Sequence, residues 1–189
     1  MALLGYAVTN QFLLGSFEVR AADLSQAGNL TSSHSVGVVD GVTLGFELTQ
    51  VDVLNGTSSL IDRNVVRQLA TIQFVFREFS DRNWRMALGQ ALDATGTTIT
   101  STVAGKTPYV TLQLIQQDRT TSGTYLVWDF WKMALDGGFE ASINHTDFAS
   151  AAIRFKTFDV TDSDVFSSST ISTLINQYPV FRYHKTTTI

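Results

Sequence analysis

The strongest constraint on the fold is a two-residue alternation of apolar and polar side chains, which is typical of β-strands with one buried face. Between residues 36 and 48 the even positions are apolar except for Asp40. A second run, from Val65 to Phe79, places Ala70, Ile72, Phe74 and Phe76 on one face. Asp40 stands beside Gly41, and this pair predicts a bulge or turn within the first strand.

A polar stretch separates these two strands and contains Asn55-Gly56, a strong turn signal. We therefore expect a hairpin with an unusually long loop over residues 49–64. Loops longer than about 12 residues are uncommon unless they have a function, so this loop is a candidate interaction site. Its predicted contact residues are Leu54, Asn55, Gly56, Thr57, Ser58, Ser59, Leu60, Ile61 and Asp62.

One short helix is predicted over Asp81–Leu88. Ser80 can cap its first turn, and Gly89 can close its end. Phe79 and Trp84 have the spacing of a hydrophobic staple. The face expected to pack on a sheet holds Trp84, Ala87 and Leu88.

The remaining segments are mostly β in pattern. Further strands are predicted over Pro108–Gln117, Thr124–Leu135, Phe139–Ile143, Ala149–Val160 and Val180–His184, and a weak helical spacing occurs within Ser167–Gln177. The fold class expected is mainly β, with two packed antiparallel sheets flanked by one short α-helix. A chain of 189 residues favours one domain, here residues 1–189.

The side chains needed for catalysis or metal binding do not come together in the sequence. Cysteine is absent, and His34, His145 and His184 are isolated. There is no G-x-S-x-G motif, and the acidic cluster Asp159, Asp162 and Asp164 lacks the Gly and Glu of a calcium loop. We therefore predict no enzyme activity, no cofactor and no metal.

Charge and hydropathy also limit the partners. The formal net charge is −4, and no basic stripe of the kind that grips nucleic acid is present. The apolar run at residues 1–15 is interrupted by Thr9-Asn10-Gln11 and is shorter than the roughly 20 residues of a membrane span, so no membrane partner is expected. Tyr125, Trp128 and Trp131 could stack on a sugar, but alternation places Trp128 opposite the other two, which favours core packing.

The order of elements from Val36 to Val160 resembles the major tail tube proteins of long-tailed bacteriophages. The resemblance rests on a Gly/Val-rich strand, VGVVDGVTLGFELTQVDV, then LNGTSSLIDRN, then VVRQLATIQFVFREFSDRNWRMALG with its helix ending in Leu-Gly. A later pair, GFEAS and DFASAAIRFKTFDVTDSD, is also similar. Together these stretches cover roughly two-thirds of the chain.

The resemblance implies hexameric rings that stack into a tube, with residues 49–64 reaching the neighbouring ring. It implies terminal arms, 1–28 and 166–189, against adjacent subunits or a sheath. DNA is expected to pass through the lumen without specific binding, and the other expected partners are tape-measure, tail terminator, sheath or baseplate proteins. The location implied is the virion tail, after synthesis in the host cytoplasm. A type VI secretion tube, another virion structural protein and a carbohydrate-binding β-sandwich remain as alternatives.

Overall fold

The structure is a computed structural model that describes residues 17–37, 39–54, 60–92, 107–118, 120–138, 140–142, 150–161, 164, 166 and 180–189. Its strands are β1 Glu18–Asp23, β2 Val39–Leu54, β3 Leu60–Phe76, β4 Val110–Gln117, β5 Tyr125–Leu135, β6 Glu140–Ser142, β7 Ser150–Thr157 and β8 Phe181–Thr186. The α-helix α1 spans Asp81–Ala87, and two 3-10 turns, Leu24–Gln26 and Ser32–His34, follow β1.

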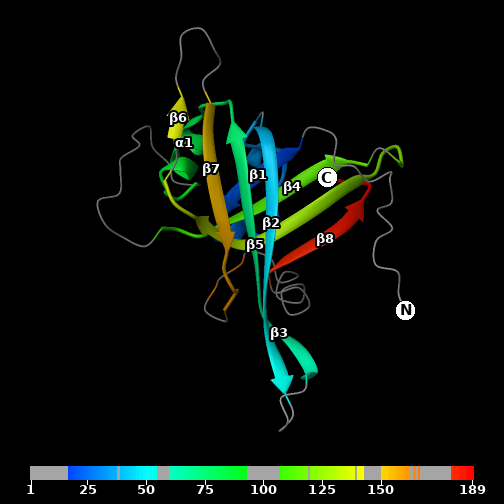
Figure 1. The fold of residues 1–189 in the computed structure, drawn as a ribbon. Helices are drawn as coiled ribbons and strands as arrows, with labels where there is room; N and C mark the ends of the chain where they lie inside the picture. The colour runs from blue at the N-terminus through cyan, green and yellow to red at the C-terminus, as the bar shows by residue number, and fades with distance from the viewer. Residues whose placement is uncertain are drawn as a thin grey trace.

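All the described strands belong to one hydrogen-bonded antiparallel sheet with the main order β1-β4-β5-β7-β3-β2. β5 bonds to β8 through Tyr125–Phe130 and to β7 through Met133–Leu135, so the sheet divides along this strand. One half contains β1, β4, β5 and β8, and the other contains β2, β3, β7 and β6. The strands of the two halves run in clearly different directions (Figure 1). The mainly β class with antiparallel strands and one α-helix is confirmed, although one continuous sheet replaces the two separate sheets that were expected.

The core lies between the two halves of the sheet. Phe74 and Phe155 come from one half, Leu112 and Phe130 come from the other, and all four side chains are no more than 1% exposed. They belong to one apolar cluster, as expected when inward-facing positions of two layers interdigitate. The predicted inner face of β3, residues 70, 72, 74 and 76, is buried as expected.

β5 is buried on both faces because a register shift changes the direction of its side chains. Val110 pairs with Met133, whereas Leu112 pairs with Phe130, so β5 contains one extra residue between them. Phe130 and Met133 both join the main core, while Trp131 enters a second small cluster. The bulge therefore explains how consecutive large side chains of this strand are all buried.

The helix α1 forms as its local signals predict. The Ser80 side chain accepts a hydrogen bond from the backbone N–H of Asn83 at 3.2 Å. The rings of Phe79 and Trp84 lie 5.3 Å apart, which confirms the predicted staple. Gly89 follows the helix with φ +63°, the left-handed conformation that ends many helices.

Three expectations about the ends and loops need correction. The segment 49–64 is not one long loop, because β2 continues to Leu54 and β3 begins at Leu60. The segment 1–28 is not a free arm throughout, since β1 pairs with β4 over its full length and Val19 and Ala21 are fully buried. Within 166–189, β8 is a strand of the sheet. Residues 55–59 and the weak helix at 167–177 lie outside the described residues.

Candidate assembly surfaces

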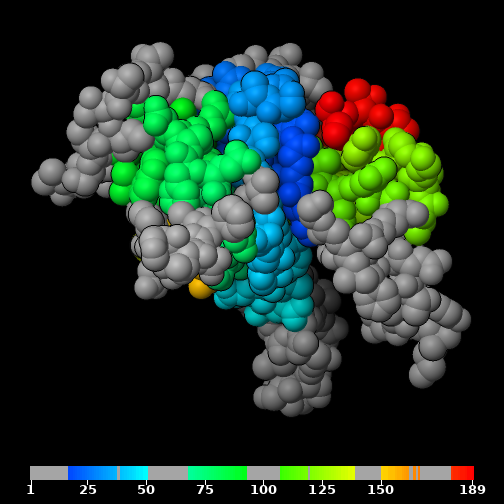
Figure 2. Space-filling model, turned by 90° about the horizontal axis from the view of Figure 1, so that it is seen from above, coloured from blue at the N-terminus to red at the C-terminus, as the bar shows by residue number. Residues whose placement is uncertain are grey.

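The most prominent surface feature is the hairpin of β2 and β3, which extends well beyond the rest of the described structure (Figure 1). The two strands stay in antiparallel register from Val39↔Phe76 to Leu54↔Leu60. The register shifts between Asp40 and Thr43, where Gly41 has φ +60°, so the predicted bulge is present. In the space-filling view, the cyan surface of the hairpin stands out from the body (Figure 2).

The inner face of β2 is apolar along its length but leaves the core partway. Val42 and Leu44 pack against the core cluster. Farther along the same face, Phe46 is 51% exposed and Leu48 is 52% exposed. An apolar face that continues past the core is a surface suited to contact with another chain segment.

The outer edge of β2 is a second feature suited to contact. Among the described strands, β2 pairs with β3 alone. The backbone groups along its other edge are therefore not bonded to a described strand, and such an edge can accept a strand from another chain. Arg77 on β3 forms an ion pair with Asp40 near the base of this edge.

Exposed aromatic side chains gather where the hairpin passes β8. We call Phe46, Leu48, Phe181 and Tyr183 the aromatic patch. The rings of Phe46 and Phe181 lie 5.2 Å apart, and that of Tyr183 lies 4.9 Å from that of Trp128. Tyr183 is 44% exposed, and Phe181 is partly buried. The patch joins the hairpin to β8 by direct ring contact.

On the opposite face, a row of polar side chains attaches β8 to the sheet. Asp129 on β5 accepts hydrogen bonds from Arg182 Nε and Nη2 at 3.0 and 2.6 Å and from Gln113 Nε2 at 2.7 Å. His184 Nδ1 lies 3.4 Å from the same carboxylate. Burial lowers the pKa of His184, Asp129 raises it and Arg182 lowers it, and the net direction is downward.

A second carboxylate attaches the other end of β8. Asp118 Oδ2 accepts a hydrogen bond from Lys185 at 3.0 Å, and Asp118 Oδ1 accepts bonds from the side chain and backbone N–H of Thr120 at 2.6 and 2.8 Å. The bonds from Thr120, followed by the bond from Lys185, lower the pKa of Asp118 to about 2. The contact with Asp118 in turn raises the pKa of Lys185.

A third ion pair lies at the end of the sheet nearest residue 164. Lys132 Nζ is 2.7 Å from Asp164 Oδ2, and both side chains are at most 10% exposed. Lys132 also lies 4.5 Å from the centre of the Tyr109 ring. Burial raises the pKa of Asp164, but hydrogen bonds from Lys132 and Thr161 outweigh it, so the pKa is lowered. The acidic position 164 is therefore part of an ion pair.

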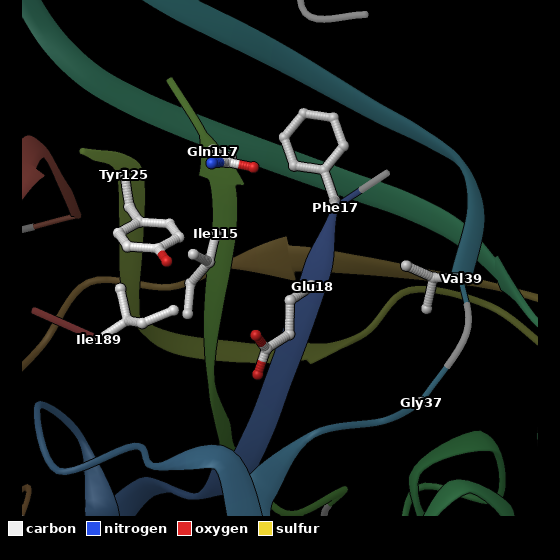
Figure 3. A pocket seen from close by; sticks show the side chains of 8 residues that line it. All are labelled: Phe17, Glu18, Gly37, Val39, Ile115, Gln117, Tyr125 and Ile189. Atoms are coloured by element: carbon white, nitrogen blue, oxygen red, sulfur yellow. The ribbon is translucent and has the colours of Figure 1, made fainter. Parts of the chain in front are cut away.

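A shallow pocket of about 320 Å³ opens beside β1 and β4. The side chains of Glu18, Gln117 and Tyr125 supply its polar groups, and Phe17, Val39, Ile115 and Ile189 supply apolar surface (Figure 3). These side chains do not include a nucleophile paired with a base. The pocket can therefore hold a small group but offers no arrangement for acyl transfer.

The predicted contact residues fall into two groups. Leu54, Leu60, Ile61 and Asp62 lie in β2 or β3, at the far end of the hairpin, while Asn55, Gly56, Thr57, Ser58 and Ser59 lie outside the described residues. The sequence did not identify Phe46 and Phe181 as surface residues. The one available signal was that the apolar alternation of β2 is longer than a core of this size needs.

The predicted helix face is only partly the packing face. Ala87 is 1% exposed, and Met86, also 1% exposed, joins it in the core. Trp84 and Leu88 are half-buried, and Trp84 lies against Phe79. Asn83 is also buried, where its amide donates to the carbonyls of Val36 and Glu78.

In the described part of the chain, no group of three His, Cys, Asp or Glu side chains is arranged to hold a metal ion. His34 accepts a hydrogen bond from the backbone N–H of Thr31 in a local turn, and His145 lies outside the described residues. Trp131 is fully buried, as core packing predicted. Among the described helices, none is long and apolar enough to cross a membrane.

No protein-family model matches the chain, and no curated relative matches it. Two solved structures share some similarity with it. One is described as the tail of an empty GTA particle computed with helical refinement and C6 symmetry (13% identity, 76% of this chain and 92% of that chain, TM-score 0.43). The other is the virion of a native gene transfer agent particle (14% identity, the same coverages, TM-score 0.44). At this level of similarity, no family is assigned to the chain.

Proposed function

We propose that this chain is a structural subunit of a phage tail, which assembles with copies of itself into hexameric rings that stack as a tube for DNA. The projecting hairpin carries this proposal. It presents a long strand edge, and its exposed inner face bears two large apolar side chains. The ring, its stacking and the passage of DNA follow the resemblance of the strand–helix–Leu-Gly segment to tail tube proteins.

The physical argument is that the hairpin needs neighbours. A two-stranded hairpin alone is marginally stable in water. Full burial of a Leu or Phe side chain stabilises a protein by about 1.5–3 kcal/mol, and Phe46 and Leu48 are each about half exposed. A second subunit on this face therefore gains roughly 1 kcal/mol from each residue. In a ring this gain is repeated at each contact.

The charges of the described sheet are compatible with a conduit for DNA. Arg77 and Arg154 on β3 and β7 are paired with Asp40 and Asp136 respectively. Paired arginines offer little free positive charge to displace counterions from DNA. The acidic net charge supports the same reading. Tape-measure, terminator, sheath or baseplate proteins are then the expected neighbours, and the virion tail is the expected location after synthesis in the host cytoplasm.

The test is negative-stain electron microscopy of the purified protein over a range of concentrations. We expect rings or hollow tubes from the wild type and none from Phe46→Ser/Leu48→Ser. Phe158→Ser is the matched control, because Phe158 is also an exposed aromatic side chain, 38% exposed, and packs on Tyr109 away from the hairpin. A wild type that stays monomeric at every concentration and binds glycans would favour the carbohydrate-binding alternative.

A deletion separates ring formation from stacking. Removing Asn55–Ser59 shortens the connection at the end of the hairpin. We expect rings that no longer stack, because the proposed inter-ring contact involves residues 54–62. Normal tubes from this variant would show that the contact lies elsewhere. Circular dichroism establishes in parallel that the variant is folded.

A further inference from the structure

We infer that the uncharged N-terminal segment, residues 1–16, packs in its own chain on the aromatic patch formed by Phe46, Leu48, Phe181 and Tyr183. This inference concerns an intramolecular surface and does not depend on the proposed tube. It accounts for two features that tube assembly leaves unexplained: the composition of the segment and the exposure of aromatic side chains on the core-facing side of β8.

The first observation is the composition of the segment. Residues 1–16 contain no Asp, Glu, Lys or Arg, and residues 12–14 are Phe-Leu-Leu. A segment that remains in solvent is normally charged and poor in large apolar residues. The N-terminal segment has the opposite composition, so it requires an apolar surface to cover.

The second observation is the position at which the described chain begins. Phe17 packs against the core, and its ring lies 6.1 Å from that of Trp128. The ring of Trp128 lies 4.9 Å from that of Tyr183. The last residue before β1 is therefore separated from the patch by one indole ring.

The third observation is the reach of the chain. Four extended residues span roughly 13 Å, so Leu13 and Leu14 can reach Tyr183 from the position of Phe17. A segment tethered this closely has a high effective concentration at the patch compared with a segment of another molecule in dilute solution. These distances favour the segment of the same chain.

The patch itself is suited to such a segment. Phe46, Leu48 and Tyr183 are 44–52% exposed, yet all three lie on faces that continue the core. Asp129, Arg182 and His184 lie on the opposite face of the sheet half, where they bond to one another. An uncharged apolar segment can thus cover the patch without burying a charge.

Cysteine pairing tests the inference directly, because the native chain has no cysteine. We expect Leu13→Cys or Leu14→Cys, combined with Tyr183→Cys, to form an intramolecular disulfide in dilute protein under mild oxidation. Thr186→Cys on the opposite face of β8 replaces Tyr183→Cys in the control and is expected to remain reduced. Intact mass and non-reducing electrophoresis identify the bridge.

Mixing two single-cysteine proteins separates contacts within one chain from contacts between chains. If Leu13→Cys and Tyr183→Cys proteins cross-link efficiently as a mixture, while the double variant gives dimers, the segment belongs to a second copy and the inference is overturned. It is also overturned if neither position 13 nor position 14 bridges to position 183.

A second measurement does not depend on disulfide geometry. Leu13→Asp/Leu14→Asp should expose the patch and raise ANS fluorescence by about twofold or more, because ANS binds exposed apolar surface. Asn10→Asp/Gln11→Glu adds the same charge to the same segment without removing an apolar side chain, and it should leave ANS fluorescence near the wild-type value. Equal fluorescence from both variants contradicts the inference. Far-UV circular dichroism shows that both remain folded.

Discussion

Asp129→Asn is the substitution whose effect the structure defines best. The Asp129 side chain is 5% exposed and accepts three hydrogen bonds, two from Arg182 and one from Gln113. Asparagine keeps the size of the side chain but removes its charge and replaces one acceptor oxygen with a donor. Arg182 then faces a neutral group at the place where β8 joins β5.

The magnitude follows from the burial of the two partners. Breaking a fully buried ion pair costs about 3–5 kcal/mol. The Arg182 side chain is 25% exposed, so it recovers part of its hydration when the carboxylate is lost. We therefore expect a loss of about 2 kcal/mol, which in a chain of this length lowers Tm by roughly 4–8 °C.

Urea unfolding of a double-mutant cycle with Arg182→Met measures the pair itself. We expect a coupling energy of about 1 kcal/mol or more. Asp136→Asn is the control, since its pair with Arg154 is 3.1 Å long but both side chains are well exposed, and such pairs contribute about 0.2–1 kcal/mol. A coupling energy near zero, or equal losses from Asp129→Asn and Asp136→Asn, would refute the reasoning.

Three further changes have defined outcomes. Gly89→Ala should destabilise the protein by about 1–2 kcal/mol in urea unfolding, because Gly89 has φ +63° and a Cβ would lie 3.0 Å from a Thr107 methyl group; Gly138→Ala, with open space around it, should change little. Asp118 contributes stability at pH values above its unfolded pKa of 3.8, and this is lost as the pH falls towards about 2; Asp118→Asn should therefore flatten the stability profile between these values. His184 has a lowered pKa, so its protonation below pH 6.5 favours the unfolded state; His184→Gln should reduce the loss of stability on mild acidification.

The elements predicted correctly are those whose signals are local. In β3, the positions 70, 72, 74 and 76 alternate in the sequence and are buried in the structure. The helix α1 has its cap, staple and terminal glycine within ten residues of one another, so it was predicted almost to its ends. Such signals depend on one strand or one helical turn and need no knowledge of the tertiary structure.

The far half of the hairpin was missed because it has no core to face. Residues 49–54 and 60–64 form ladder hydrogen bonds in register, but a strand outside the core is not required to alternate. Asn55-Gly56 correctly indicated a turn, yet the polar residues around it were assigned to a loop. The β1 strand was missed for a different reason: Val19, Arg20, Ala21 and Ala22 are all buried, so no period of two is present.

The surfaces were hidden from the sequence because they depend on pairs of distant residues. Phe46 and Phe181 are each ordinary apolar residues of a strand, and only the tertiary structure places their rings 5.2 Å apart. Asp129 and Arg182 come together in the same way, through the pairing of β5 with β8. The sequence predicted the strands, whereas the contacts between them required the topology.

The contact between Phe46 and Phe181 connects the stability of β8 to the hairpin, and this leads to a prediction about assembly. Asp129 holds β8 in place through Arg182, and the adjacent Phe181 supports Phe46 on β2. Asp129→Asn should therefore reduce tube formation more than Gly89→Ala does, although both are expected to cost about 2 kcal/mol at most. The measurement is the protein concentration at which assemblies first sediment, determined for both variants alongside their urea midpoints. If the two variants raise this concentration equally at equal stability, the aromatic contact does not transmit the state of β8 to the hairpin.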